Sequence, residues 1–177
     1  MATENSAFSQ LLLELQNRID TEIGTNVIRM VDEDKGQLES YDPKTQRPPV
    51  SWPCVLIGFD IDEPQDMGEN TQRITGRAIL RLGFPPFSMA SSWMPLSVKQ
   101  KALRYFDYEW LIYKALNGWQ PDKFDVLAFR GASSEKREDP IRVRELLYEI
   151  GWEETSAQTV RTTIPKPPME WEEEEEI

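Results

Sequence analysis

The sequence contains no histidine and a single cysteine, Cys54. Histidine is the commonest general base and the commonest transition-metal ligand in proteins, so its absence weakens most catalytic interpretations. One cysteine excludes an internal disulfide, and the apolar run Pro53-Cys54-Val55-Leu56-Ile57 predicts that it is a buried strand residue. Gly-rich phosphate loops, metal-spaced cysteines and a Gly-x-Ser-x-Gly elbow are also missing. We therefore expect no enzymatic activity, no cofactor and no metal.

Long hydrophobic runs are absent as well. No stretch approaches the roughly 18 apolar residues that a membrane span requires. The start, Met1-Ala2-Thr3-Glu4-Asn5, has neither the basic beginning nor the apolar stretch of a signal peptide. We expect a protein that does not enter a membrane and stays in the compartment where it is made.

Positive charge is in deficit, because 20 Lys and Arg face 31 Asp and Glu, which gives a net charge of −11. Glu170 and Glu172 to Glu176 contribute six of the negative charges, so the rest of the chain is only mildly acidic. Wrapping nucleic acid takes clustered Lys and Arg, which makes that function an unfavourable interpretation.

The 177 residues, 39% of them hydrophobic, suffice for one core. We expect a single α+β domain over residues 1–154. Residues 155–177 lose all periodicity and are rich in Pro and Glu, which predicts an extended acidic tail. Such a tail is usually solubilising, but Trp171 is placed to anchor it on another molecule.

Hydrophobic periodicity predicts an amphipathic helix over Asn5–Ile23, ended by Gly24. A short strand is expected at Asn26–Val31. The polar stretch Asp32–Ser51 reads as an unusually long loop, with a strand at Gln37–Tyr41 as the alternative.

Alternating apolar residues predict a long antiparallel hairpin, Val55 to Ile61 with Ile74 to Phe84. Placing Ile61 opposite Ile74 sets Phe59 against Gly76, Ile57 against Ala78, Val55 against Leu80 and Asp62 against Arg73. The connecting loop Glu63–Thr71 should project from the sheet.

A second helix is predicted from Leu96 or Ser97 to Asn117, with one apolar face packed on the sheet. That face consists of Leu103, Phe106, Trp110, Tyr113 and Leu116. Two further strands, Phe124–Arg130 and Ile141–Trp152, follow on either side of a polar loop. The expected class is α+β, a mainly antiparallel sheet flanked by two helices.

Three charged patterns invite a functional interpretation, and each has a simpler one. Asp32, Asp34 and Gly36 resemble a calcium loop, but the glycine comes one place early and the required later Glu is missing. Asp60 and Asp62 are better explained as ion-pair partners than as an acid–base pair. The outer face of the second strand carries an arginine series. Such a series is more typical of a solvent-exposed sheet face than of a phosphate site, and it comprises Arg73, Arg77 and Arg81.

The connection Phe84–Pro95 is unusually apolar for a loop between strand and helix. It either folds under the domain or is covered by another molecule, because aromatic residues and Met are enriched at interface cores. Its candidate interface residues are Phe87, Met89, Trp93 and Met94. Asp66 and Met67 in the projecting loop are further candidates.

The order of elements resembles the phage tail terminator or minor tail (tail completion) proteins, including those of Mu-like prophages. The resemblance spans about Ser6 to Glu154. It rests on that order, on Pro53 ahead of the Val55–Ile61 strand, and on the helix end Ala115-Leu116-Asn117-Gly118-Trp119.

The resemblance implies a structural virion protein without catalysis, found in the tail or neck and, during assembly, in the host cytoplasm. It implies a homo-oligomeric ring, commonly of six subunits, that caps the tail tube, ends its polymerisation and meets the head–tail connector protein, with DNA only passing through the lumen. Two alternatives stay open: a head–tail connector or neck component, and a cellular adaptor that binds through its acidic tail.

Overall fold

A six-stranded sheet forms the centre of the computed structural model, which describes residues 6–40, 48–86 and 91–155. The strand order is β1-β2-β4-β6-β5, and β3 pairs with the beginning of β4. Only β1 and β2, among the strands described, pair in parallel. The strands are β1 (Met30–Glu33), β2 (Cys54–Ile61), β3 (Gln65–Gly68), β4 (Thr71–Phe84), β5 (Ala128–Ser134) and β6 (Arg142–Glu154).

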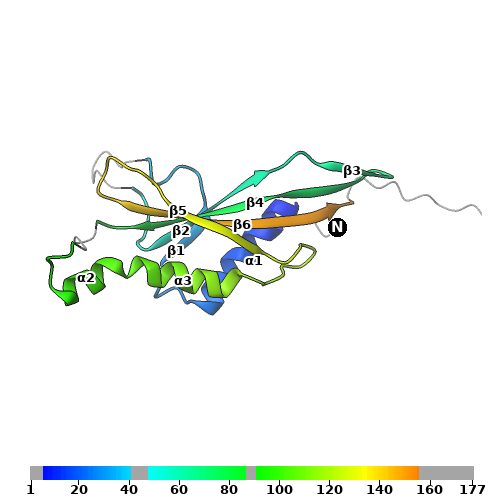
Figure 1. Ribbon diagram of the computed structural model, residues 1–177. Helices are drawn as coiled ribbons and strands as arrows, with labels where there is room; N and C mark the ends of the chain where they lie inside the picture. The colour runs from blue at the N-terminus through cyan, green and yellow to red at the C-terminus, as the bar shows by residue number, and fades with distance from the viewer. Residues whose placement is uncertain (1–5, 41–47, 87–90, 156–177) are drawn as a thin grey trace, which may run out of the picture.

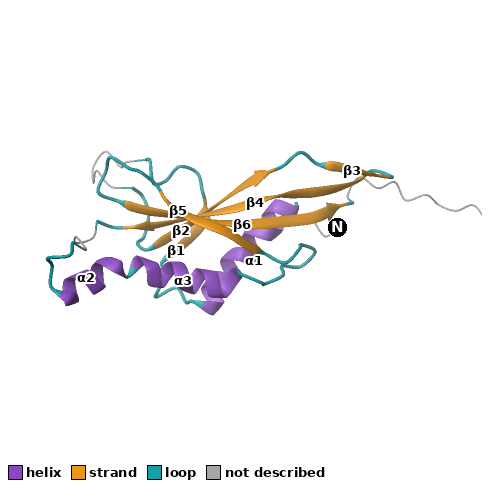
Figure 2. Ribbon diagram, viewed as in Figure 1, coloured by secondary structure: helices purple, strands orange, loops and turns teal. Residues whose placement is uncertain are grey.

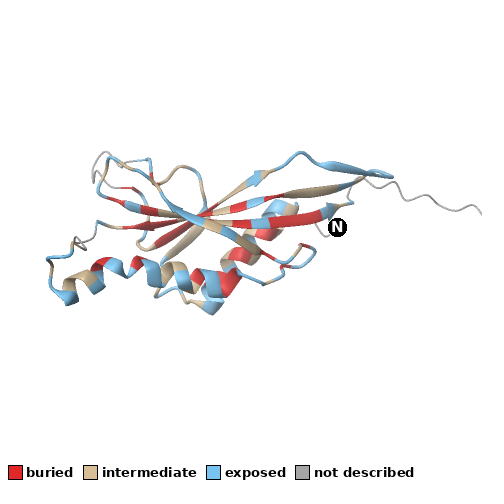
Figure 3. Cartoon of the chain, in the orientation of Figure 1, coloured by how far each residue is buried: buried red, intermediate tan, exposed pale blue. Residues whose placement is uncertain are grey.

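Three helices lie along one face of this sheet (Figures 1 and 2): α1 (Ala7–Glu22), α2 (Leu96–Leu103) and α3 (Tyr105–Leu116). The main core fills the space between helices and sheet, and the burial colouring of Figure 3 shows the red segments facing each other there. The predicted α+β class with a mainly antiparallel sheet is confirmed.

Helix α1 follows its sequence closely. Ser6 caps it by accepting a hydrogen bond from the backbone N–H of Ser9 at 3.3 Å. Its buried residues, Leu11, Leu15 and Ile19, recur at four-residue steps and so share one face. Gly24, with φ of 94°, takes the left-handed conformation that ends many helices. The predicted helix is confirmed.

The predicted hairpin exists, but its predicted register is wrong by two residues. Ile61 lies opposite Gly76, Phe59 opposite Ala78, and Val55 opposite Leu82. A Cβ at position 76 would lie 2.4 Å from the carbonyl oxygen of Asp60, so this close approach of the two strands requires glycine.

The predicted loop Glu63–Thr71 is also more ordered than expected. Its residues Gln65–Gly68 form β3, which pairs with the first residues of β4 through the two-residue turn Glu69-Asn70. Both turn residues have positive φ, 51° and 59°, which a two-residue hairpin turn of type I′ requires. Because β3 takes Thr71 to Arg73 as partners, β2 is left with the stretch that begins at Gly76.

The first predicted strand was placed too early. Residues 25–27 form a turn in which the N–H groups of Val27 and Ile28 donate to the carbonyl of Gly24. The strand begins only at Met30, where it pairs in parallel with Cys54. The alternative strand at Gln37–Tyr41 is wrong for its described part, because Gly36 accepts turn hydrogen bonds from Glu39 and Ser40.

The later elements also differ in their bounds. The predicted second helix is divided at Arg104 into α2 and α3, since the N–H of Arg104 bonds to Lys101 in a tighter turn. The strand predicted at Phe124–Arg130 begins at Ala128, and Gly131–Ser134, predicted as loop, extend it. The last strand continues to Glu154.

A smaller cluster covers the opposite face of the sheet at one end. Leu38 from the turn after β1 packs there with strand residues, and Gly83 lies beneath it. Burial raises the pKa of the Cys54 thiol to about 12, as expected of an inert thiol in this cluster. The buried members are Leu38, Cys54, Leu56, Ile141 and Val143.

Gly83→Ala should destabilise the protein by about 1–3 kcal/mol, because an added Cβ would lie 2.7 Å from the Cys54 sulfur and 2.8 Å from Trp52. Urea unfolding followed by circular dichroism measures this. The matched control is Gly58→Ala, whose Cβ would meet nothing nearer than 3.9 Å. Equal stability of the two variants would contradict the packing described here.

Candidate protein-interaction surface

The helical segment α2–α3 is apolar on two opposite sides. Its inner side is buried in the main core through Tyr105, Ile112, Ala115 and Leu116, and Ala102 of α2 is buried as well. Its outer side carries four large residues at steps of three and four, which places them in one stripe. They are Leu103, Phe106, Trp110 and Tyr113, with exposed fractions of 42%, 47%, 58% and 38%. We call these four residues the helix face.

The sequence predicted that this same stripe faces the core, and that prediction is wrong except for Leu116. The side of α3 that meets the core is formed by Tyr105, Ile112, Ala115 and Leu116, and an ion pair joins this helix to β6. The Arg144 side chain on β6 donates to both carboxylate oxygens of Glu109 at 2.8 and 3.0 Å. On the inner side Tyr105 packs toward Phe84, with ring centroids 6.2 Å apart, whereas the neighbouring Phe106 is 47% exposed.

Cations border the helix face. Lys114 Nζ lies 4.6 Å from the centroid of the Trp110 ring, and Arg144 Cζ lies 5.6 Å from that of Phe106. Lys99, Lys101, Arg104 and Lys114 form no ion pair within the part of the chain that the structure describes. Of these, Lys114 lies over Trp110, and Lys101 and Arg104 line one hollow together with Leu103, so unpaired cations lie near both ends of the exposed stripe.

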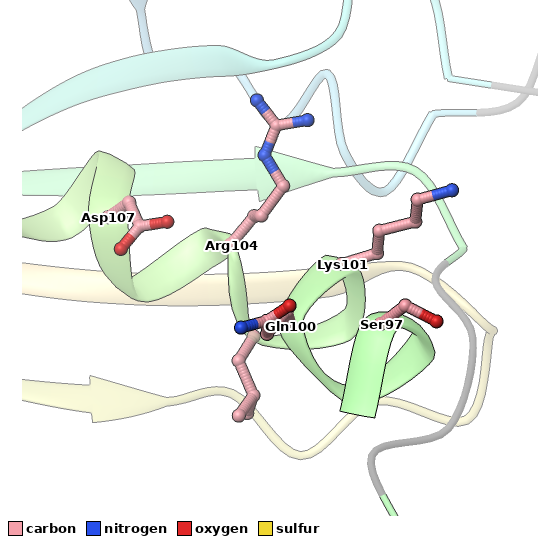
Figure 4. Close-up of a pocket in the computed structure, with 6 residues that line it drawn as sticks. Ser97, Gln100, Lys101, Arg104 and Asp107 are labelled. Carbon is pink, nitrogen blue, oxygen red and sulfur yellow. The ribbon is translucent and has the colours of Figure 1, made fainter. Parts of the chain in front are cut away.

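A shallow hollow of about 540 Å³ lies at the junction of α2 and α3. Figure 4 shows Lys101 and Arg104 reaching to the same side of the helix above Ser97 and Gln100. Most of its lining side chains are long and exposed, whereas a small-molecule site is normally concave and mostly apolar. The hollow therefore continues the surface beside the helix face and does not form a separate ligand pocket.

The β3–β4 hairpin is a second exposed feature, and it extends beyond the body of the sheet (Figure 1). All four β3 residues are exposed, and Met67 is 58% exposed. Asp66 shapes the bend by accepting a hydrogen bond from the N–H of Gly68 at 2.8 Å. The sequence-predicted candidates Asp66 and Met67 thus lie together on a protruding, exposed tip.

Comparison with known proteins bears on the fold. No protein-family model and no curated protein matches the chain. Among solved structures, one match is a chain of the virion of a native gene transfer agent (GTA) particle, with a TM-score of 0.50 and 13% identity. The fold is similar to that of a virion protein. The alignment covers 84% of this chain and 98% of the GTA virion chain, so nearly all of that chain has a counterpart here.

The remaining sequence candidates are only partly placed. Trp93 is 76% exposed just before α2, and the half-buried Met94 donates its N–H to the carbonyl of Ser91 at 3.0 Å. Phe87, Met89 and Trp171 lie outside the described residues. Phe106, Trp110 and Tyr113, which the sequence predicts as core residues, are the additional members of this surface. The signal for them was that nearly every side of Leu96–Leu116 carries large apolar residues.

The outer face of the sheet carries an ion cluster around Arg81. Its guanidinium bonds Asp34 at 2.9 Å, Glu39 at 2.5 Å and Glu135 at 2.5 Å. Arg137 adds bonds to Glu39 at 2.9 Å and to the carbonyl oxygen of Leu38 at 2.8 Å. The cluster fastens the turn after β1 and the loop after β5 onto β4.

Each of the three charged patterns has at least one residue with a structural partner. Asp34 is held by Arg81, Arg73 is paired with Asp125, and the Asp62 carboxylate accepts a hydrogen bond from Thr75 at 3.4 Å. The predicted contact of Asp62 with Arg73 is wrong because of the register shift. Residues 6–40, 48–86 and 91–155 contain no group of three or more Asp, Glu or Cys side chains that could hold a metal ion. In the same residues, no helix has the length and apolar character needed to cross a bilayer.

Hydrogen bonds from Arg81, and less so from Arg137, lower the pKa of Glu39 from 4.5 to about 2. Because the pKa is lower in the folded protein than in the unfolded chain, this stabilisation is complete above pH 4.5 and is lost as the pH falls through about 2. Glu39→Gln should therefore reduce the free energy of unfolding at pH 7, by at most about 1 kcal/mol because the side chain is 49% exposed.

Unfolding in urea at pH 7 and at pH 2.5 measures this difference. The wild-type advantage over Glu39→Gln should shrink at the lower pH, whereas the exposed Glu138→Gln should match wild type at both. A wild-type advantage that is the same at both pH values would contradict the assignment.

Proposed function

We propose that this protein is a structural component of a phage-like virion and acts by binding other proteins. The observation that supports the proposal is the shared fold with the GTA virion chain, at a TM-score of 0.50 over 84% of the sequence. One fold can host many functions, so the function of this chain depends on its surfaces.

Two surfaces of this chain suit protein contacts. The helix face presents aromatic side chains of the types that dominate protein interfaces, Trp, Tyr and Phe, in a stripe that the domain leaves exposed. The β3–β4 hairpin tip protrudes from the opposite end of the molecule (Figure 1). Contacts at two different ends suit a heterologous interface, in which one subunit meets the next through unlike patches and a ring can close.

More specifically, we propose that the protein is a tail terminator. It would form a homo-oligomeric ring, most simply of six subunits, that caps the tail tube and ends its polymerisation. Such a ring would bind the tail tube protein on one side and the head–tail connector protein on the other. It would reside in the tail or neck of the virion, after assembly in the host cytoplasm, and would perform no catalysis.

The purified protein should form a ring of several subunits, visible by negative stain and with a mass set by light scattering across a concentration series. The double variant Phe106→Ser/Trp110→Ser should weaken this association by about tenfold or more, because central aromatic residues dominate interface energies. Its thermal unfolding should change little, since both side chains are about half exposed in the single chain.

Leu13→Ser is the matched control, because Leu13 is 55% exposed on α1, outside the helix face. It should leave the ring intact. A strict monomer at every concentration, or a ring that survives the double variant unchanged, would contradict the assignment of the helix face as the subunit contact.

A further inference from the structure

The helix face is a strip of apolar surface that the described part of the chain leaves uncovered. A helix that is apolar on two sides is normally buried on both, and here only the inner side has a partner. Exposed aromatic stripes of this kind mark binding sites or promote aggregation. Covering this stripe with another segment would therefore lower the free energy of the free protein.

The charges on α2–α3 indicate which kind of segment would bind to the stripe. Lys99, Lys101, Arg104 and Lys114 give α2–α3 an excess of positive charge, since Glu109 is neutralised by Arg144 and only Asp107 remains as an exposed acid. The protein as a whole carries −11. The complementary ligand is acidic and contains an aromatic anchor, and the sequence itself holds one in Met169-Glu170-Trp171 followed by Glu172 to Glu176.

The chain is long enough to bring this segment to its own helix face. Phe106 lies at the level of Arg144 on β6, ten residues before Glu154, a distance along the strand of about 33 Å at roughly 3.3 Å per residue. Trp171 follows Glu154 by 17 residues, which reach at most about 56 Å when extended. A tether of this length gives an effective concentration of the order of millimolar, which favours contact within one chain.

We propose that residues 156–177 bind the helix face of the same chain, with Trp171 on the aromatic stripe and the glutamates beside Lys101, Arg104 and Lys114. The acidic segment then covers the stripe until a protein partner displaces it. Single-stranded nucleic acid also combines bases that stack with phosphates that attract cations, but it would have to approach a strongly negative protein. This proposal does not rest on the virion assignment.

Photo-crosslinking of the full chain tests the contact. The variant Trp171→p-benzoylphenylalanine is diluted to a concentration at which light scattering shows monomers, so that no neighbouring copy covers the helix face. It is then irradiated as an equimolar mixture of ¹⁴N- and ¹⁵N-labelled protein, and cross-linked peptides are identified by mass spectrometry. We expect cross-links to the peptide that carries Leu103 to Tyr113, with both halves bearing the same isotope. Peptide pairs of mixed isotopes would show binding between copies and would overturn the proposal.

Charge reversal separates docking from chance proximity. Lys101→Glu/Arg104→Glu/Lys114→Glu should lower the cross-link yield about fivefold or more, because attraction becomes repulsion. The control Lys35→Glu/Arg29→Glu/Lys136→Glu changes the same residue types at exposed positions elsewhere and should keep the yield. Equal yields in the two triple variants would overturn the proposal. A third outcome would also overturn the proposal. In it, no cross-links to α2–α3 form, and a labelled oligonucleotide binds to the protein but not to the charge-reversal variant.

Discussion

The architecture depends on β4, the longest strand. Its fourteen residues pair with β6 along thirteen positions and with β2 and then β3 on the other side, so that it joins every part of the sheet except the outermost strands. Side chains alternate along it, which sends Leu80, Leu82 and Phe84 to the helices and Arg81 and Gly83 to the other side. The position of each helix, loop and tip follows from that alternation.

The two sides of β4 are stabilised by different physical means. Apolar packing against α1 and α3 covers one side, where the buried residues form one continuous cluster. On the other side the arginines of β4 hold nearby loops by ion pairs, as Arg81 does with Asp34 and Glu135. Removing one member of such a partly buried cluster leaves its partners without compensation, so the cluster acts more as a positioning device than as a source of net stability.

Much of the fold could be predicted from the sequence because local pattern and tertiary environment agree there. Helix α1 and the long hairpin follow from periodicity and capping. The hairpin register could not be predicted, because it depends on a two-residue turn, Glu69-Asn70, in which neither residue is glycine. The division of the predicted helix into α2 and α3 at Arg104 could not be predicted either, because no glycine or proline marks that position.

The interaction surface was harder to predict than the fold. The segment Leu96–Leu116 has two apolar stripes, and periodicity alone cannot say which one meets the sheet. That choice is made by contacts between distant parts of the chain, such as the packing of Tyr105 toward Phe84 and the ion pair of Glu109 with Arg144, 35 residues away. Periodicity within one segment contains no information about such contacts.

The edges of the sheet limit how copies of this protein can meet. Strands β1 and β3 have only four residues each, and β5 has a register shift between Phe129 and Gly131 that interrupts its hydrogen-bonding row. Short or bulged edges are poor templates for adding another strand. Growth into fibrils by strand addition is thus disfavoured at these edges, which leaves side-chain surfaces as the better route for contact between copies.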